Sequence, residues 1–264
     1  MRMAPNKQTW ESEETVTLYR LQEGLQKPEK TILRLLQSVI AGGRVLDIGV
    51  GAGRTTPYFS QAAREYIGID YSPGMIAACR EKFRGASQSL SFIVCDVRDM
   101  HCFGDHSFDF VMFSYNGLDY LPPEDRQAAL GEIKRVCRPG GYFAFSTHNM
   151  HSAPRLFRLL PKCDSWQWPY MIYVNHRRRA LNPHFRQLLK RKFAIFNDGA
   201  LNFRLWTYYV EPRHQIEQLH AVGFTDVRVF SLSDGSEIKT MELLDENRDS
   251  WLYFCMPQVA RGFH

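Results

Sequence analysis

Glycines and acidic side chains recur in this chain of 264 residues where successive short apolar runs end. The first run leads into the stretch from Asp47 to Gly53, in which glycine occupies every second position from Gly49 onward. Glycine has no Cβ atom, so the backbone can turn sharply there and come within contact distance of a ligand. Asp70 ends the second run, where a carboxylate can accept hydrogen bonds from both hydroxyls of a ribose. Asp96 ends the third run, where it could accept a hydrogen bond from an adenine amino group.

The elements that position these residues alternate in type. Short apolar runs at residues 44–48, 66–69, 90–94, 108–113 and 142–145 are separated by helix-like segments such as 72–83 and 123–136. Strands that alternate with helices predict a parallel, doubly wound α/β sheet, which binds ligands at the carboxyl ends of its strands. Two amphipathic helices, at 13–26 and 29–41, precede the first strand. After residue 149 the alternation stops, and it resumes with a helix at 212–221 and strands at 224–231 and 251–256.

The glycine turn alone does not identify a ligand, because a dinucleotide-binding fold also places Gly-x-Gly after its first strand. Taken with the other features, the chain resembles class I S-adenosylmethionine-dependent methyltransferases of the small, ubiquinone-biosynthesis-like type. Five ordered motifs carry the resemblance: Asp47 to Gly53, Ile67 to Ser72, Cys95-Asp96-Val97, Phe108 to Met112, and Arg138 to Gly141. They span residues 42–148 closely, and residues 208–256 fit more loosely. The resemblance also argues against NAD, because a nicotinamide enzyme would have no use for Asp96.

This resemblance implies the fold and its division. We expect an α/β, Rossmann-like seven-stranded sheet in the order 3-2-1-4-5-7-6, with the last strand antiparallel. Residues 1–264 would form a single methyltransferase domain with an N-terminal helical cap at 1–41. An inserted substrate lid at 149–205 would lie between strands 5 and 6.

The same resemblance implies how the cofactor, S-adenosyl-L-methionine, would be held. The methionine part would lie over the glycine turn and near Ser114, with Arg54 either pairing with its carboxylate or remaining an exposed helix residue. Asp70 would take the ribose, and Asp96 the adenine amine. The full set of expected cofactor residues is Asp47, Gly49, Gly51, Gly53, Arg54, Asp70, Tyr71, Met75, Asp96, Val97 and Ser114.

Candidate catalytic residues follow the fourth and fifth strands. A sulfonium methyl group is already activated, so transfer mainly requires a nucleophile that is held opposite the sulfur and freed of any proton. Tyr115 and Asn116 could touch the acceptor, although Asn116-Gly117 could also be a simple turn. His148 could be a general base or a structural residue. Tyr19 and Arg20 could close the other side of the site.

Charge is distributed unevenly along the chain. Of 33 Lys and Arg, seven lie between Ser165 and Asn197, a stretch without Asp or Glu. The rest of the chain has 26 basic and 28 acidic residues, so the positive excess lies in this segment. The run Arg177 to Arg179 and its neighbours could form a solvated face, a site for an anionic small substrate, or a nucleic-acid surface. Aromatic residues of this segment and of the strand that follows, Trp166, Trp168, Tyr170, Tyr173, Trp206, Tyr208 and Tyr209, could enclose a substrate or form the segment's own core.

The leading hypothesis is a methyltransferase for O or N atoms of a small molecule, which could be anionic. The alternatives are an RNA or tRNA methyltransferase, and a protein that binds or cyclises the cofactor without methyl transfer.

We expect no metal site, because the six cysteines form no C-x-x-C pair, and they should be reduced. No apolar run is long enough to span a membrane and no signal peptide is evident, so we expect a cytoplasmic protein without a membrane partner. The oligomeric state stays open.

Overall fold

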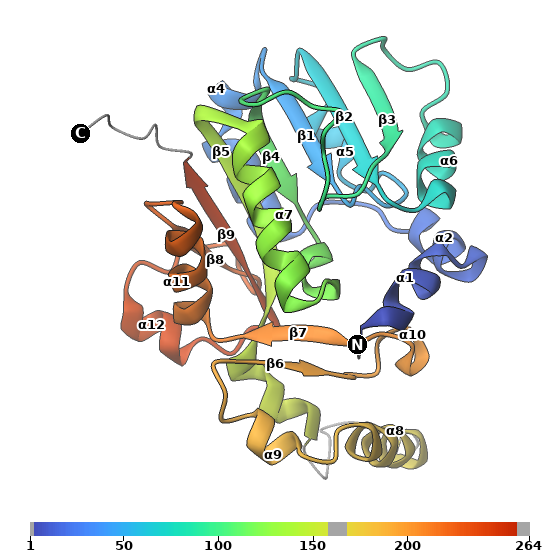
Figure 1. Cartoon of the computed structure of the whole chain (residues 1–264), viewed down its shortest axis with the longest axis vertical. Helices are drawn as coiled ribbons and strands as arrows, with labels where there is room; N and C mark the ends of the chain where they lie inside the picture. The colour runs from blue at the N-terminus through green and yellow to red at the C-terminus, as the bar shows by residue number, and fades with distance from the viewer. Residues whose placement is uncertain (1–2, 158–167, 258–264) are drawn as a thin grey trace.

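Five parallel strands form the centre of the sheet in the computed structural model, which describes residues 3–157 and 168–257. Their order is β3-β2-β1-β4-β5, with every neighbouring pair parallel (Figure 1). The strands are β1 (Arg44–Ile48), β2 (Glu65–Asp70), β3 (Leu90–Val94), β4 (Phe108–Phe113) and β5 (Cys137–Asn149). The carboxyl ends of β1, β2 and β3 therefore lie at one edge, and this edge carries the glycine turn, Asp70 and Asp96.

Two C-terminal strands complete the expected arrangement. The last strand, β9 (Trp251–Pro257), runs antiparallel to β5, and β8 (Arg228–Ser231) pairs with the outer edge of β9. Counted among the seven predicted strands, β9 is the seventh and β8 the sixth. The predicted order 3-2-1-4-5-7-6 is confirmed, and so is the antiparallel last strand.

The described sheet nevertheless has nine strands, two more than we expected. The additional strands, β6 (Phe193–Phe196) and β7 (Thr207–Val210), form a hairpin at the end of the inserted segment. β4 pairs with β5 up to Phe145, and β7 pairs with β5 further on, at His148 and Asn149. β9 pairs with the opposite edge of β5 at His148. The hairpin therefore pairs with the same edge of β5 as β4 does, beyond the point where β4 ends. The unusual length of β5 makes this extension possible.

Helices cover both faces of the sheet. One face packs against α7 (Pro123–Val136), α11 (Pro212–Val222) and α12 (Met241–Glu246), and the other packs against the helices between residues 27 and 82 (Figure 1). These are α3 (Lys27–Leu35), α4 (Gln37–Ile40), α5 (Thr56–Phe59) and α6 (Pro73–Lys82). The remaining helices are α1 (Ala4–Glu11), α2 (Glu13–Arg20), η1 (Gly117–Tyr120), η2 (Met150–Phe157), α8 (Trp168–Leu181), α9 (Phe185–Leu188) and α10 (Ala200–Phe203).

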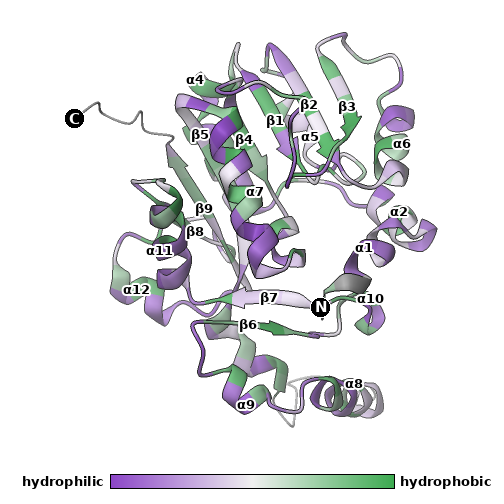
Figure 2. Ribbon diagram, in the orientation of Figure 1, coloured by the Kyte–Doolittle hydropathy of each residue, from purple (hydrophilic) through white to green (hydrophobic). Residues whose placement is uncertain are grey.

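The alternation of side chains along the strands explains the two cores. In β1, Leu46 and Ile48 contribute to one buried cluster and Val45 to the other. All six residues of β4 are buried, as expected for a central strand that is covered on both faces. Helix α7 has hydrophilic and hydrophobic residues along its length, and its buried side includes Leu130 and Ile133 (Figure 2). Packing of these apolar faces fixes the edge at which the polar residues meet.

The helix after β2 begins as the sequence predicts. Ser72 caps α6, since its Oγ accepts a hydrogen bond from the Met75 backbone N–H at 3.4 Å, and Pro73 occupies the first turn. The cap fixes the direction in which the chain leaves Asp70. Across the described ranges, no helix is both long and apolar enough to cross a lipid bilayer.

Candidate active site

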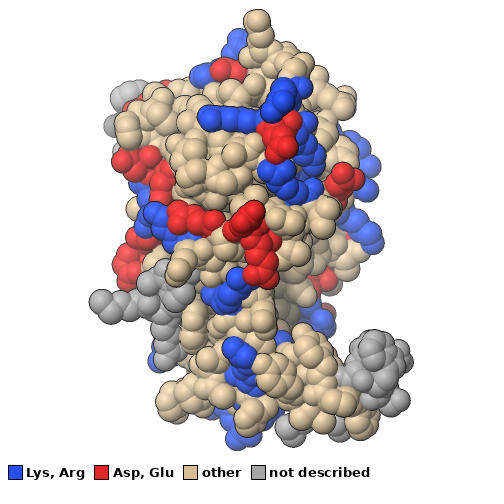
Figure 3. All heavy atoms as spheres, turned by 90° about the vertical axis from the view of Figure 1, so that its right-hand side faces the viewer, with Lys and Arg blue, Asp and Glu red and all other residues tan. Residues whose placement is uncertain are grey.

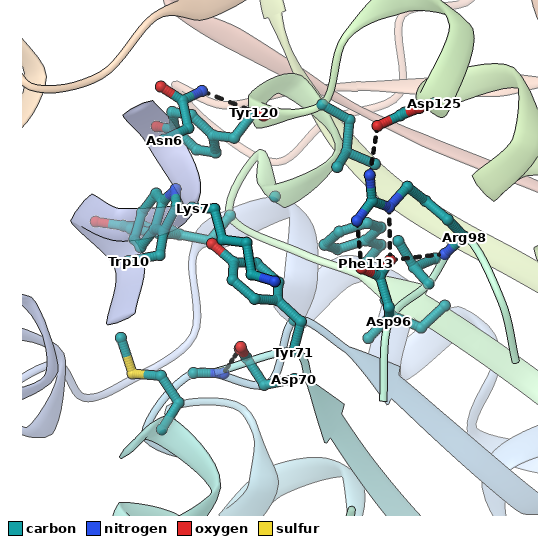
Figure 4. A pocket seen from close by; sticks show the side chains of 18 of the residues that line it. Asn6, Lys7, Trp10, Asp70, Tyr71, Asp96, Arg98, Phe113, Tyr120 and Asp125 are labelled. Carbon is teal, nitrogen blue, oxygen red and sulfur yellow. Dashed lines mark hydrogen bonds and ion pairs between the residues drawn. The ribbon is translucent and has the colours of Figure 1, made fainter. Parts of the chain in front are cut away.

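A cavity of about 360 Å³ lies at the carboxyl edge of the parallel strands (Figure 4). Nine of the fourteen residues that the sequence predicts for the site line it: Gly49, Gly51, Asp70, Tyr71, Met75, Asp96, Val97, Ser114 and Tyr115. They come from the ends of β1, β2, β3 and β4 and from the start of α6. The fold therefore brings together residues that span 67 positions of the sequence, from 49 to 115.

The glycine turn needs its glycines. Gly49 and Gly51 have φ angles of +61° and +55°, in the left-handed region that residues with a Cβ atom rarely adopt. A Cβ atom on Gly49 would lie 2.6 Å from Phe113 Cε2, and one on Gly51 would lie 3.2 Å from Tyr19 Cδ1. Neighbouring side chains thus occupy the space that a Cβ atom would need at these two positions. Gly53, with φ of +81°, does not line the cavity, and a Cβ atom there would lie 2.5 Å from Phe83 Cε2.

Asp70 is fixed by backbone groups at the end of β2. The Ser72 N–H donates to Oδ1 at 2.9 Å, and the Gly51 N–H donates to Oδ2 at 3.1 Å. Burial raises the pKa of Asp70 to about 6, although these two hydrogen bonds lower it in part. The carboxylate is ionised at neutral pH and keeps lone pairs for hydroxyl donors on the cavity side.

Asp96 lines the cavity and is paired with Arg98. Arg98 donates to both of its oxygens, from Nε at 2.9 Å and from Nη2 at 2.7 Å, and its Nη1 reaches Asp125 of α7 at 2.6 Å. Figure 4 shows Arg98 between the two carboxylates. Although burial raises the pKa of Asp96, the Arg98 hydrogen bonds outweigh this effect and leave the pKa below its ordinary value. Arg98 and Asp125 were not predicted from the sequence, because the approach of α7 to this loop is a tertiary contact.

Asp47 lies beneath the glycine turn and does not line the cavity. It is fully buried, and its Oδ2 accepts hydrogen bonds from Thr55 and Tyr66. Burial raises its pKa to about 6. Its Oδ1 has no hydrogen-bond partner among the described residues. The buried Oδ1 of Asn116, which follows β4, also lacks one.

Helix α1 forms the roof of the cavity. The sequence predicts a helical cap at 1–41, but it does not predict which residues of α1 line the cavity. Met3, Asn6, Lys7 and Trp10 all contribute to the lining. Asn6 is 2% exposed and fastens the roof, since its Nδ2 donates to Tyr120 O at 3.1 Å and Trp206 O at 2.8 Å. Its Oδ1 also accepts from the Trp206 N–H at 2.9 Å. The sequence of α1 shows only weak amphipathicity, because the inward side of this helix faces a cavity and not a core. The helix is therefore hard to predict from the sequence pattern.

Comparison with known proteins assigns this chain to a family. A methyltransferase domain model matches residues 45–141. A demethylmenaquinone methyltransferase of Clavibacter sepedonicus is 30% identical over 196 residues, which cover 74% of this chain and 71% of that protein. The chain belongs to the class I S-adenosylmethionine-dependent methyltransferases. Two other curated relatives match less of their own length, and the alignments cover 51% and 58% of them.

Solved structures share the fold of this methyltransferase. An S-adenosylmethionine-dependent methyltransferase from Mesorhizobium loti superposes with a TM-score of 0.59 at 20% identity, over 87% of this chain and 97% of that one. A 1,6-didemethyltoxoflavin-N1-methyltransferase of Burkholderia thailandensis, with bound 1,6-didemethyltoxoflavin and S-adenosylhomocysteine, gives a TM-score of 0.53 at 16% identity, over 89% and 79%.

S-adenosylmethionine is therefore the cofactor, and the residues present fit it. Glycine has no Cβ atom, so Gly49 and Gly51 bring only backbone to the cavity wall, and the buried Asp47, two residues before this turn, keeps one unpaired carboxylate oxygen. Asp70 offers a carboxylate to hydroxyl donors. The cofactor prediction is confirmed, whereas the contact of each residue with the cofactor stays a prediction.

Aromatic rings form the wall beyond the glycine turn. Trp10 meets Tyr19 and Tyr120 edge to face, with ring centroids 5.2 and 4.9 Å apart, and Tyr19 meets Tyr115 at 6.3 Å. All four line the cavity. Tyr115 and Asn116 both have left-handed backbones, with φ of +56° and +61°, and this strain turns Tyr115 toward the cavity while Asn116 points into the protein.

His148 lies outside the cavity, behind Tyr120. Its Nδ1 is 2.7 Å from Asp119 Oδ2, which also accepts the His148 backbone N–H at 2.6 Å. Asp119 and Arg126 form a fully buried ion pair of 2.7 Å beside it. The general-base hypothesis placed His148 at the site because it ends β5, but β5 continues past the cavity, and the side chain joins this buried network instead.

Arg54 does not line the cavity either, although its Nη2 donates to Oγ of the lining residue Ser114 at 3.4 Å. Its guanidinium forms two hydrogen bonds with Glu29 of α3, at 2.6 and 2.7 Å, and lies 5.0 Å from the centroid of the Tyr115 ring. Its side chain is 11% exposed, so it is not the exposed helix residue of the alternative interpretation either. Arg54 instead fastens α3 to the glycine turn. Of the pair expected to close the site, Tyr19 lines the cavity and Arg20 pairs with Glu81.

The basic insertion contributes no described residue to the cavity lining. Arg178 donates to Leu156 O at 2.6 Å and Asp198 O at 2.9 Å, and Arg179 donates to Phe157 O, so both hold the insertion together. Nor do the described aromatic residues of this segment and of the strand that follows enclose the cavity, which was one of the two interpretations of them. Trp168, Tyr170 and Tyr173 are exposed on α8, Trp206, Tyr208 and Tyr209 do not line the cavity, and Trp166 lies outside the described residues. On the face drawn in Figure 3, the lowest part of the molecule shows Lys and Arg without Asp or Glu, as the excess of basic residues in the insertion predicts.

Proposed function

We propose that this methyltransferase transfers a methyl group to an O or N atom of a small-molecule acceptor held under α1. The observation that carries the proposal is the shared cavity, in which the predicted cofactor residues and an aromatic wall face the same roofed space. A roof fastened by Asn6 leaves room for a small molecule. Proteins with similar sequence or fold include a demethylmenaquinone methyltransferase and a 1,6-didemethyltoxoflavin-N1-methyltransferase, whose names also indicate small acceptors.

The chain's own residues would act by positioning the reactants and excluding water. The bound cofactor supplies an activated methyl group. The carboxylate of Asp70 would hold the ribose, and the loop of Asp96 and Val97 would hold the adenine. Trp10, Tyr115 and α1 would shield the acceptor from solvent, which strengthens every polar contact inside the site.

The aromatic wall favours a flat or apolar acceptor. Burial raises the pKa of Tyr19 and of Tyr120 well above the ordinary value, so both phenols stay neutral and can donate hydrogen bonds. We propose Tyr115 as a residue that positions the acceptor, and a positioning role for His148 acting through Tyr120. A nucleophile that arrives unprotonated, such as a neutral amine or an ionised oxygen acid, suits this site. Of the three described acids that line the cavity, Asp96 and Asp125 are paired with Arg98, and Asp70 would be taken by the ribose.

An anionic acceptor and an RNA acceptor receive less support. Both hypotheses rest on the basic insertion, whose described residues lie outside the cavity. Lys7 is the cation of α1 that faces the cavity, and one cation is a modest preference for an anion (Figure 4).

Methyl transfer can be tested by incubating the protein with S-adenosylmethionine and a panel of phenols, carboxylic acids and amines, followed by mass spectrometry. We expect S-adenosylhomocysteine to accumulate together with an acceptor that has gained one methyl group. The Tyr115→Ala variant should lose turnover while it still binds cofactor, and Glu23→Ala, at an exposed position, serves as the matched control. Consumption of the cofactor without any acceptor, to a product other than S-adenosylhomocysteine, would support the cyclising alternative instead.

A further inference from the structure

Two thiols meet beside the adenine side of the cavity. The Sγ atoms of Cys95 and Cys102 lie 3.6 Å apart, which is van der Waals contact. Cys102 is exposed, whereas Cys95 is half-buried and lines the cavity. The other described cysteines, Cys79, Cys137 and Cys255, are buried.

The chain is anchored on both sides of this thiol pair. The Cys95 N–H continues the sheet by donating to Asp70 O at 3.1 Å. At the other end, the Met100 N–H donates to Glu132 of α7 at 2.8 Å, and Arg135 donates to Phe103 O at 2.8 Å. The sheet and α7 therefore hold the two thiols close to each other.

The residues between the two cysteines belong to the cavity. Asp96, Val97 and Arg98 all line it, and Arg98 connects this loop to Asp125 of α7 (Figure 4). A covalent link between Cys95 and Cys102 would close a ring around this loop. The ring would contain the carboxylate that we assign to the adenine.

We propose that Cys95 and Cys102 are a redox modification site, at which a reversible disulfide fixes the 96–101 loop in its cofactor-binding conformation. The part of the proposal that concerns affinity rests on the proposed place of the adenine against this loop. The oxidant we name is a low-molecular-weight disulfide such as oxidised glutathione.

The reaction balances as two thiol–disulfide exchanges. The exposed Cys102 thiolate attacks oxidised glutathione, which forms a mixed disulfide and releases one glutathione thiolate. The Cys95 thiolate then attacks the Cys102 sulfur and releases the second. Two cysteine thiols are oxidised and one glutathione disulfide is reduced, and the two cysteine protons end on the two glutathione thiols.

The geometry suits this order of attack. Access favours Cys102 for the first step, and the second step needs the sulfurs to approach from 3.6 Å to about 2.05 Å. The exposed side chain of Cys102 can provide most of that movement. Burial raises the pKa of Cys95 to about 12, so the second step should be slow near neutrality and accelerate as pH rises.

The disulfide should strengthen cofactor binding. The thiols already touch in the conformation in which Asp96 and Val97 line the cavity. Holding that conformation removes part of the ordering cost of binding, which is the usual gain from preorganisation.

The test treats the full chain with oxidised glutathione and maps its peptides by mass spectrometry. We expect one internal disulfide that joins Cys95 to Cys102. S-adenosylhomocysteine should then bind several-fold more tightly than to the reduced protein, and a thiol reductant should reverse both changes. Cys102→Ser should abolish them, and Cys137→Ala, at a buried thiol away from the cavity, should not.

Each other outcome overturns a stated part of the proposal. A stable glutathione adduct on Cys102, or a disulfide that involves Cys163, would refute the modification site. A Cys95–Cys102 disulfide that leaves affinity unchanged or weaker would refute its role in the loop. Failure of reduced wild-type protein to bind S-adenosylhomocysteine would instead refute the proposed cofactor site, and peptide mapping would still decide the disulfide.

Discussion

Asp70 is preorganised for its proposed role, because the backbone N–H groups of Gly51 and Ser72 hold its carboxylate before any ligand arrives. Such residues were predictable from the sequence, since they follow the ends of strands whose apolar pattern is clear. Lys7, Trp10 and the other roof residues were not, since no local pattern records contacts between α1 and a loop more than a hundred residues away. Arg54 could not be placed for the same reason, because its partner Glu29 lies in α3, 25 residues earlier in the sequence.

The raised pKa of Asp70 predicts a pH dependence of cofactor binding. Its value of about 6 means that the carboxylate becomes protonated as the pH falls through 6, and it then accepts hydrogen bonds less well. Affinity for S-adenosylhomocysteine should therefore be constant above pH 7 and fall below 6, as measured by calorimetric titration. Asp70→Ala should flatten this profile in part, and the remainder would belong to Asp47, whose pKa is also about 6. A wild-type profile that is flat from pH 5 to 8 would contradict this assignment.

Gly51 offers a second test at the residue scale. Gly51→Ala places a Cβ atom 3.2 Å from the Tyr19 ring and forces alanine into a left-handed backbone, which costs about 1–2 kcal/mol. Gly85→Ala shares the positive φ but has no heavy atom within 4 Å of the added Cβ, so it is the matched control for the backbone effect. We expect both variants to lose stability in thermal denaturation and Gly51→Ala alone to lose cofactor affinity. Equal affinities would show that the turn does not touch the cofactor.

At the scale of elements, the sequence predicts the first four strands of the central sheet well because each one is a short apolar run. The predicted strand at 142–145 covers only the middle of β5, which has 13 residues. The sequence does not predict the β6–β7 hairpin, whose strands have four residues each and depend on the exposed edge of β5. Nor does it predict which residues of the N-terminal helical cap form the roof, since the stabilising contacts of α1 are made by Asn6 and Trp10 with distant segments.

The roof can be loosened through Asn6. Asn6→Ala removes three hydrogen bonds to Tyr120 and Trp206, each worth roughly 1 kcal/mol. We expect faster proteolysis of the N-terminal segment and about tenfold weaker binding of S-adenosylhomocysteine. Gln8→Ala, at an exposed position on the same helix, should change neither. Unaltered proteolysis and affinity in Asn6→Ala would mean that α1 does not close the site.

The network behind the aromatic wall should be important for stability. Asp119→Ala leaves Arg126 buried without its carboxylate and removes the partner of His148, which should cost about 3–5 kcal/mol of unfolding free energy in urea denaturation. Arg213→Ala breaks the exposed pair with Asp245 and should have little effect. A similar, small loss in both variants would show that the buried pair is not a structural support.

At the scale of the whole molecule, charge and cofactor chemistry occupy different regions. The excess of Lys and Arg belongs to the insertion, where Arg178 and Arg179 bind main-chain oxygens and the described residues leave the cavity untouched. Replacing Arg186, Lys190 and Arg191 by Gln should therefore leave cofactor affinity unchanged.

Calorimetric titration with S-adenosylmethionine and S-adenosylhomocysteine tests the central claim most directly, namely that the cavity between Asp70 and Asp96 binds the cofactor. Wild type should bind both compounds in the micromolar range, and the triple Gln variant of the insertion should match it. Asp70→Ala should bind at least about tenfold more weakly, a loss of about 1.4 kcal/mol. Absence of binding by the folded wild-type protein, or equal binding by Asp70→Ala, would contradict the account.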